Sequence, residues 1–140
     1  MMQHPVKNSE CEACLRKLLI NEGYKLSPRL GNGELGVDII ATNGSIQYYI
    51  EVIGYKKAGP TRSKDFYEVF FRVISRLNDG AKRLVIALPI QYRVGFRSRV
   101  KQYRVGWERI GNVFPELDIW FVDIDNQVFE QSTWNECLKI

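Results

Sequence analysis

The residues best suited to chemistry are two carboxylates, Asp38 and Glu51, which lie on either side of an Asn43-Gly44 pair. Asn-Gly is the preferred loop of a tight β-hairpin, so the sequence predicts a hairpin over residues 36–53. With Asn43-Gly44 as the loop, Asp38 lies opposite Tyr49 and diagonal to Glu51, about 7–8 Å away on the same face. Carboxylates that converge from adjacent strands are the hard oxygen ligands that Mg²⁺ prefers.

The opposite face of this hairpin is predicted to be core, because its alternate positions are all apolar or aromatic. These positions are Val37, Ile39, Ala41, Ile46, Tyr48, Ile50 and Val52. The two acids therefore lie on the mixed face, away from the predicted core.

The remaining elements place this hairpin in an α/β fold. A Ser9–Glu12 capping box and a closing Gly23 predict a first helix. Helical spacing of apolar residues and capping signals predict further helices over 65–78, 96–110 and 132–138. Apolar runs predict strands over 24–30, 83–88 and 117–122, the last continued by 126–130. The order α-β-β-β-α-β-α-β predicts a mixed sheet flanked by helices.

Length and composition limit the class of protein. The 140 residues are 45% apolar, which indicates one folded domain over 1–140 and excludes a disordered chain. No apolar run approaches the roughly 20 residues of a membrane helix, and the first nine residues lack the apolar stretch of a signal peptide. A cytoplasmic protein without membrane contact is expected.

Charge is concentrated in the middle of the chain. Residues 54–110 carry 14 Lys or Arg against 4 Asp or Glu, whereas residues 111–140 carry 1 against 6. A basic middle segment is typical of a phosphate-binding surface, although solvated helix faces give the same statistic. The candidate nucleic-acid contacts are Lys56, Lys57, Arg62, Lys64, Arg97, Lys101 and Arg104.

The stretch GELGVDIIATNGSIQYYIEVIGYKK resembles the core of the PD-(D/E)XK nucleases, a superfamily with a restriction-endonuclease-like αβββαβ fold. Archaeal Holliday junction resolvases and Mrr-type restriction enzymes are the nearest members in pattern. The resemblance implies that Asp38 and Glu51 bind Mg²⁺ or Mn²⁺ for phosphodiester hydrolysis. Glu12, eleven residues before Gly23, keeps the spacing of a helix glutamate that assists the metal in resolvase-like members. The resemblance also implies that DNA is the partner, with RNA as the alternative, and by analogy that the protein is a homodimer.

The chain departs from this family at the motif lysine, because Ile53 stands two residues after Glu51. We expect Lys56 or Lys57, beyond Gly54, to take over the role as catalytic cation, and Lys64 or Arg72 from the next helix could also serve. Two functions follow. One is a Mg²⁺-dependent endonuclease with a displaced cation, and the other is an inactive nuclease-fold protein that binds nucleic acid or another protein.

The candidate site residues also have structural explanations. Asp38 could bind backbone amides at the end of a strand, and Glu51 could be a surface carboxylate paired with Lys56 or Arg29. Glu12 is explained by helix capping. Cys11 and Cys14 have zinc-ligand spacing that His4 and Cys137 could complete, but their i, i+3 placement in a helix predicts two buried apolar residues.

Overall fold

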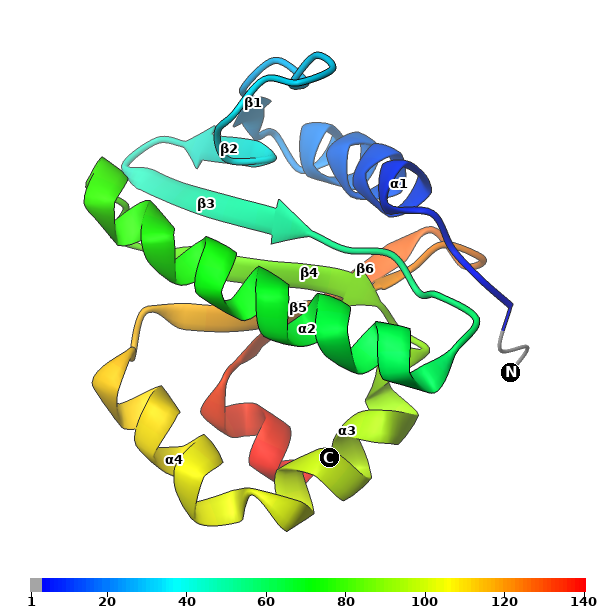
Figure 1. The fold of residues 1–140 in the computed structure, drawn as a ribbon. Helices are drawn as coiled ribbons and strands as arrows, with labels where there is room; N and C mark the ends of the chain where they lie inside the picture. Colours follow the sequence, from blue (N-terminus) through cyan, green and yellow to red (C-terminus); the bar gives the residue numbers. More distant parts are fainter. Residues whose placement is uncertain (1–3) are drawn as a thin grey trace.

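A computed structural model describes residues 4–140 as an α/β fold around a six-stranded mixed sheet (Figure 1). The strands lie in the order of the sequence, β1-β2-β3-β4-β5-β6. The first three are antiparallel, β3, β4 and β5 run parallel, and β6 is antiparallel to β5. Their bounds are β1 Lys25–Leu26, β2 Ile39–Asn43, β3 Ile46–Val52, β4 Leu84–Pro89, β5 Leu117–Asp123 and β6 Val128–Thr133.

Helices cover both faces of the sheet, as Figure 1 shows. One face carries α1 (Asn8–Asn21) alone. The other carries α2 (Gly59–Ile74), α3 (Tyr92–Gln102), α4 (Arg104–Val113) and the 3₁₀ turn η2 (Asn135–Lys139), while a second 3₁₀ turn, η1 (Ser75–Asp79), continues α2. The predicted α/β order is confirmed, and the helix predicted over 132–138 is the 3₁₀ turn η2.

Several predicted helix boundaries are wrong. Helix α1 begins at Asn8, and its capping acid is Glu10, which accepts a bond from the Lys7 backbone N–H at 3.1 Å. Helix α2 begins at Gly59, so the predicted start at Asp65 is too late. The single helix predicted over 96–110 is two helices that meet at Tyr103. The prediction that Glu12 caps this helix is therefore wrong.

The hairpin forms, but its register differs from the prediction by two residues. Asn43 pairs with Ile46 and Ile39 pairs with Ile50, so Gly44 and Ser45 form the loop. A two-residue shift leaves every side chain on its predicted face. Continuing the pairing by one residue places Asp38 opposite Glu51, instead of opposite Tyr49 as predicted.

The core lies on both faces of the central strands. All six residues of β4 are buried, as the prediction of a central strand required. On the side of α2, an aromatic cluster fills the space between helices and sheet; it comprises Phe66, Phe96, Trp107, Phe121 and Trp134. In the described part of the chain, no helix is both long and apolar enough to cross a membrane.

Candidate functional site

The two predicted acids converge on the side of the sheet that α2 covers. Asp38 immediately precedes β2, and its Oδ2 accepts a 2.8 Å hydrogen bond from the Val52 backbone N–H on β3. This bond across the hairpin fixes the Asp38 carboxylate beside Glu51. The structural explanation for Asp38, binding of a strand-end amide, is therefore correct, and it brings the two acids together.

Two arginines, Arg72 at the end of α2 and Arg76 in η1, reach this acid pair. Arg72 Nε donates to Glu51 Oε1 at 3.1 Å, and Arg72 Nη2 lies 3.9 Å from Asp38 Oδ2. Arg76 Nε lies 3.8 Å from Glu51 Oε2, and its Nη1 lies 3.1 Å from Asp79 Oδ2. Because η1 directly continues α2, Arg76 lies about one turn after Arg72, and the two guanidiniums form a cationic edge over the carboxylates. We call Asp38, Glu51, Arg72 and Arg76 the acid–arginine cluster.

Glu51 is the innermost member of this cluster. It is 1% exposed, whereas the side chains of Asp38 and Arg72 are 25% and 43% exposed. Burial, and next the negative charge of Asp38, raise the pKa of Glu51 from 4.5 to about 7, although Arg72 opposes this shift. The Oε2 atom of Glu51 is buried without a hydrogen-bond partner among the described residues. The expectation that Glu51 is a surface carboxylate is wrong.

Glu12 binds arginines on the α1 side. Its Oε2 lies 2.7 Å from Arg16 Nε and 3.5 Å from Arg29 Nε. Arg16 in turn donates to the backbone carbonyl oxygen of Asp38 at 2.8 Å. The Glu12 carboxylate is thus tied to Asp38 through Arg16, and its part in metal binding stays a prediction.

The lysines after β3 lie away from the acids. Lys56 Nζ lies 3.5 Å from Asp65 Oδ2 in the first half of α2 and 3.5 Å from Asn8 Oδ1, and Lys57 is exposed. Asp65 and Arg72 are both on α2, and at a rise of about 1.5 Å per residue they lie about 10 Å apart along its axis. Ile53 is buried at 2% exposure. Of the cations that the sequence offered in place of the motif lysine, Arg72 is the one at the acid pair.

The other predicted nucleic-acid contacts lie on the helices of the α2 side. Lys64 lies on α2, Arg97 and Lys101 on α3, and Arg104 at the start of α4, all exposed. Arg62 is half-buried and donates to the backbone carbonyls of Lys56 and Lys57. These five basic residues are therefore spread over one helical layer, and Arg62 differs from the other four because its side chain hydrogen-bonds to the backbone.

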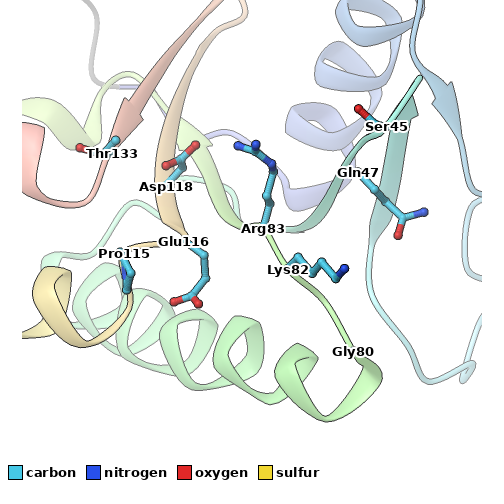
Figure 2. Close-up of a pocket in the computed structure, with 9 residues that line it drawn as sticks. All are labelled: Ser45, Gln47, Gly80, Lys82, Arg83, Pro115, Glu116, Asp118 and Thr133. Carbon is cyan, nitrogen blue, oxygen red and sulfur yellow. The ribbon is translucent and has the colours of Figure 1, made fainter.

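A second region with polar side chains lies at the opposite end of the strands. A cavity of about 830 Å³ opens beside the amino ends of β4 and β5, where Arg83 and Asp118 project to the same side (Figure 2). Burial raises the pKa of Asp118 to about 6, and the charge of Arg83 opposes this shift. None of the residues that line this cavity belongs to the acid–arginine cluster.

The three cysteines are free and buried, as their helix spacing predicted for Cys11 and Cys14. Within residues 4–140, no three His, Cys, Asp or Glu side chains are grouped so that they could hold a metal ion. Oxygen ligands at the acid–arginine cluster would thus come from Asp38 and Glu51 together with backbone or substrate atoms.

The sequence matches no protein-family model, and no curated protein or solved structure shows a significant similarity to it. The case for a function therefore depends on the geometry of the cluster.

Proposed function

We propose that the chain is a nuclease-fold domain acting on DNA, in which Asp38 and Glu51 bind Mg²⁺ and Arg72 replaces the motif lysine. The observation that carries this proposal is the position of Arg72, whose guanidinium contacts both carboxylates. The order α1-β1-β2-β3-α2-β4, with β4 parallel to β3, also fits a restriction-endonuclease-like core.

The residues of the cluster fit a divalent cation. Glu51 Oε2 is a buried carboxylate oxygen without a hydrogen-bond partner in the described chain, and the carboxylate of Asp38 is held next to Glu51 by the Val52 amide. Bound Mg²⁺ would polarise a scissile phosphate and lower the pKa of an attacking water. Asp38 and Glu51 would hold the ion.

Arg72 has two tasks in this proposal. Without a metal its guanidinium offsets the two carboxylate charges, which would otherwise repel each other. Its side chain is 43% exposed, so it can turn toward solvent when a cation takes its place. A guanidinium stays charged at every physiological pH and binds phosphate oxygens in a fork, so Arg72 then contacts the substrate.

Cleavage assays test this proposal. Purified protein is incubated with supercoiled plasmid, four-way-junction DNA and single-stranded RNA, with Mg²⁺, Mn²⁺ or EDTA. We expect metal-dependent nicking that Asp38→Asn and Glu51→Gln abolish and that Arg72→Gln lowers by about 10²-fold or more, the usual cost of removing one electrostatic group. Glu68→Gln, at an exposed position of α2, is the matched control and should cleave normally. Failure to nick any substrate with either metal would exclude the proposal.

A second function, nucleic-acid binding by an inactive nuclease fold, is favoured by a different observation. Glu51 is 1% exposed and both its oxygens face arginines, an arrangement that serves as a buried ion pair without any metal. This reading predicts binding that weakens steeply with salt and survives Glu51→Gln. Activity that appears only in Ile53→Lys would identify the natural protein as inactive.

A further inference from the structure

A separate cavity of about 490 Å³ lies where the start of α2 meets the start of α3. Its volume falls within the range of small-molecule sites, and its wall is mostly apolar with a few polar side chains, as is typical of such sites. None of its lining residues belongs to the acid–arginine cluster. They are Tyr55, Gly59, Arg62, Ser63, Gln91, Tyr92, Val94, Gly95, Phe96 and Arg99.

Two arginines face this cavity without carboxylate partners. Arg62 donates to the backbone carbonyls of Lys56 and Lys57, and its guanidinium lies 4.6 Å from the centre of the Tyr55 ring. Arg99 donates to Ser63 Oγ at 2.8 Å. In the part of the chain that is described, neither guanidinium forms an ion pair, so both positive charges are uncompensated at one cavity.

The amino end of α2 opens onto the same cavity. The residue before its first turn is Ala58, whose side chain cannot cap the helix, and Pro60 occupies the first turn. Gly59 at the helix start is part of the cavity wall. The amino end of a helix carries partial positive charge and free N–H groups, and an anion there would act as the missing cap.

A buried hydroxyl points to a ligand independently of these charges. Tyr92 is 5% exposed, and its Oη atom is buried with no hydrogen-bond partner within residues 4–140. An unmade hydrogen bond of this kind is costly, and buried polar groups in native proteins usually find a partner. Burial raises the pKa of Tyr92 well above its usual range, so the hydroxyl is a neutral donor.

After burial, the negative charge of Asp65 adds to the rise in the pKa of Tyr92. Asp65 is not part of the cavity wall, and Lys56 Nζ lies 3.5 Å from its carboxylate. Arg62 and Arg99 oppose the effect of Asp65 on Tyr92. The balance of charge at the cavity is therefore positive.

We propose that this cavity binds a phosphate ester of a nucleotide, with Arg62 and Arg99 as the charge partners and the Tyr92 hydroxyl as a further donor. A phosphate alone would leave much of the space empty, whereas a nucleotide unit would also meet the aromatic wall of Tyr55 and Tyr92, whose ring centres lie 5.1 Å apart. The proposal does not depend on the acid–arginine cluster, because it needs neither metal nor cleavage.

The test measures polarisation of a fluorescein-labelled single-stranded oligonucleotide in EDTA, so that no cleavage interferes. Arg62→Gln and Arg99→Gln should each weaken binding about tenfold, the effect of losing one charge-assisted hydrogen bond. Tyr92→Phe, which removes only the hydroxyl, should weaken it about threefold. Arg99→Gln should also lower the slope of log K against log salt by about 0.7, as expected for one lost phosphate contact.

The control is Lys101→Gln, which removes one charge from an exposed position on the same helix and does not line the cavity. Losses of equal size in Lys101→Gln and Arg99→Gln would overturn the proposal, because they would indicate a diffuse basic surface. No effect of Tyr92→Phe would exclude the hydroxyl as a ligand. Arg99→Lys, which keeps the charge but loses the fork, should bind between wild type and Arg99→Gln, and it serves if the glutamine variant does not fold.

Competition identifies the source of the phosphate. If a nucleoside monophosphate displaces the labelled strand from the wild type but not from Arg99→Gln, the cavity holds a single nucleotide. If only unlabelled oligonucleotide competes, the cavity holds a phosphate within a strand. Both results support the proposal, whereas loss of cleavage in Glu51→Gln with unchanged oligonucleotide binding would concern the acid–arginine cluster alone.

Discussion

Replacement of Glu51 by glutamine changes how the stability of the protein depends on pH. Glu51 is buried beside Asp38, Arg72 and Arg76, and its pKa is raised from 4.5 to about 7. Glutamine has the same shape and can accept the same bond from Arg72, but it does not titrate. A comparison of the two proteins across pH therefore isolates the ionisation of this one carboxyl group.

The sign and size follow from the raised pKa. Below pH 4.5 Glu51 is protonated in both the folded and the unfolded chain. Between 4.5 and about 7 only the folded chain keeps the proton, so wild-type stability falls as pH rises, and above about 7 the loss is complete. At about 1.4 kcal/mol per pH unit, this interval corresponds to about 3 kcal/mol. The free energy of unfolding of Glu51→Gln minus that of the wild type should therefore rise by about 3 kcal/mol as the pH increases from 4.5 to about 7.

Urea unfolding in EDTA, followed by fluorescence of the buried Trp107, Trp120 and Trp134, measures this difference at each pH. Titrating groups away from the acid–arginine cluster, including Asp118 at the far end of the strands, are present in both proteins and cancel. Glu68→Gln removes the same charge from an exposed site on α2 and should vary by about 0.5 kcal/mol or less. A flat difference for Glu51→Gln, or one that falls with pH, would refute the assigned burial and partners of Glu51.

Two further predictions concern packing and the thiols. Gly54→Ala should destabilise the protein by about 1–3 kcal/mol in urea unfolding, because an added Cβ would lie 2.1 Å from the Val6 carbonyl oxygen; Gly106→Ala, where a Cβ meets nothing, should be neutral or stabilising by up to about 1 kcal/mol. The thiols of Cys11, Cys14 and Cys137 should react with a disulfide reagent only after the protein unfolds, because burial raises the pKa of all three. Fast reaction in the native state would contradict this prediction.

The hairpin illustrates how far the sequence could predict the site. Both Asn43-Gly44 and Gly44-Ser45 are good two-residue loops, and the protein uses the second, with Gly44 at φ +62° in the first loop position. Glycine at that position is typical of a type II′ turn, whereas Asn-Gly favours type I′. The faces were predictable because both registers preserve them, but the partner of Asp38 was not.

The boundaries of the helices were predicted less well, for local reasons. Gly59 and Pro60 read as a loop, yet proline fits the first turn of a helix, where its missing N–H costs nothing. The apolar spacing from Phe96 to Trp107 continues through the break at Tyr103, so periodicity could not reveal two helices.

The replacement for the motif lysine depends on tertiary placement. The sequence offered Lys56, Lys57, Lys64 and Arg72, and only the packing of α2 across β3 brings one of them to Glu51. The same packing buries Glu51, which the hairpin pattern alone placed on an open mixed face. Arg76 was missed, although its position four residues after Arg72 put it on the same side of the helix.

These two facts, a buried glutamate and an arginine over it, leave two functions that the titration of Glu51 can separate. A metal ion that binds Asp38 and Glu51 favours the ionised carboxylate, so it stabilises the folded protein most above about pH 7. At about 100 times its Kd, Mg²⁺ would add about 2.7 kcal/mol to the wild type, and much less to Glu51→Gln. In a nuclease, Mg²⁺ should therefore remove most of the pH dependence measured in EDTA. In a binding module whose carboxylate serves only as an ion pair with Arg72 and Arg76, the pH dependence should be the same with and without Mg²⁺.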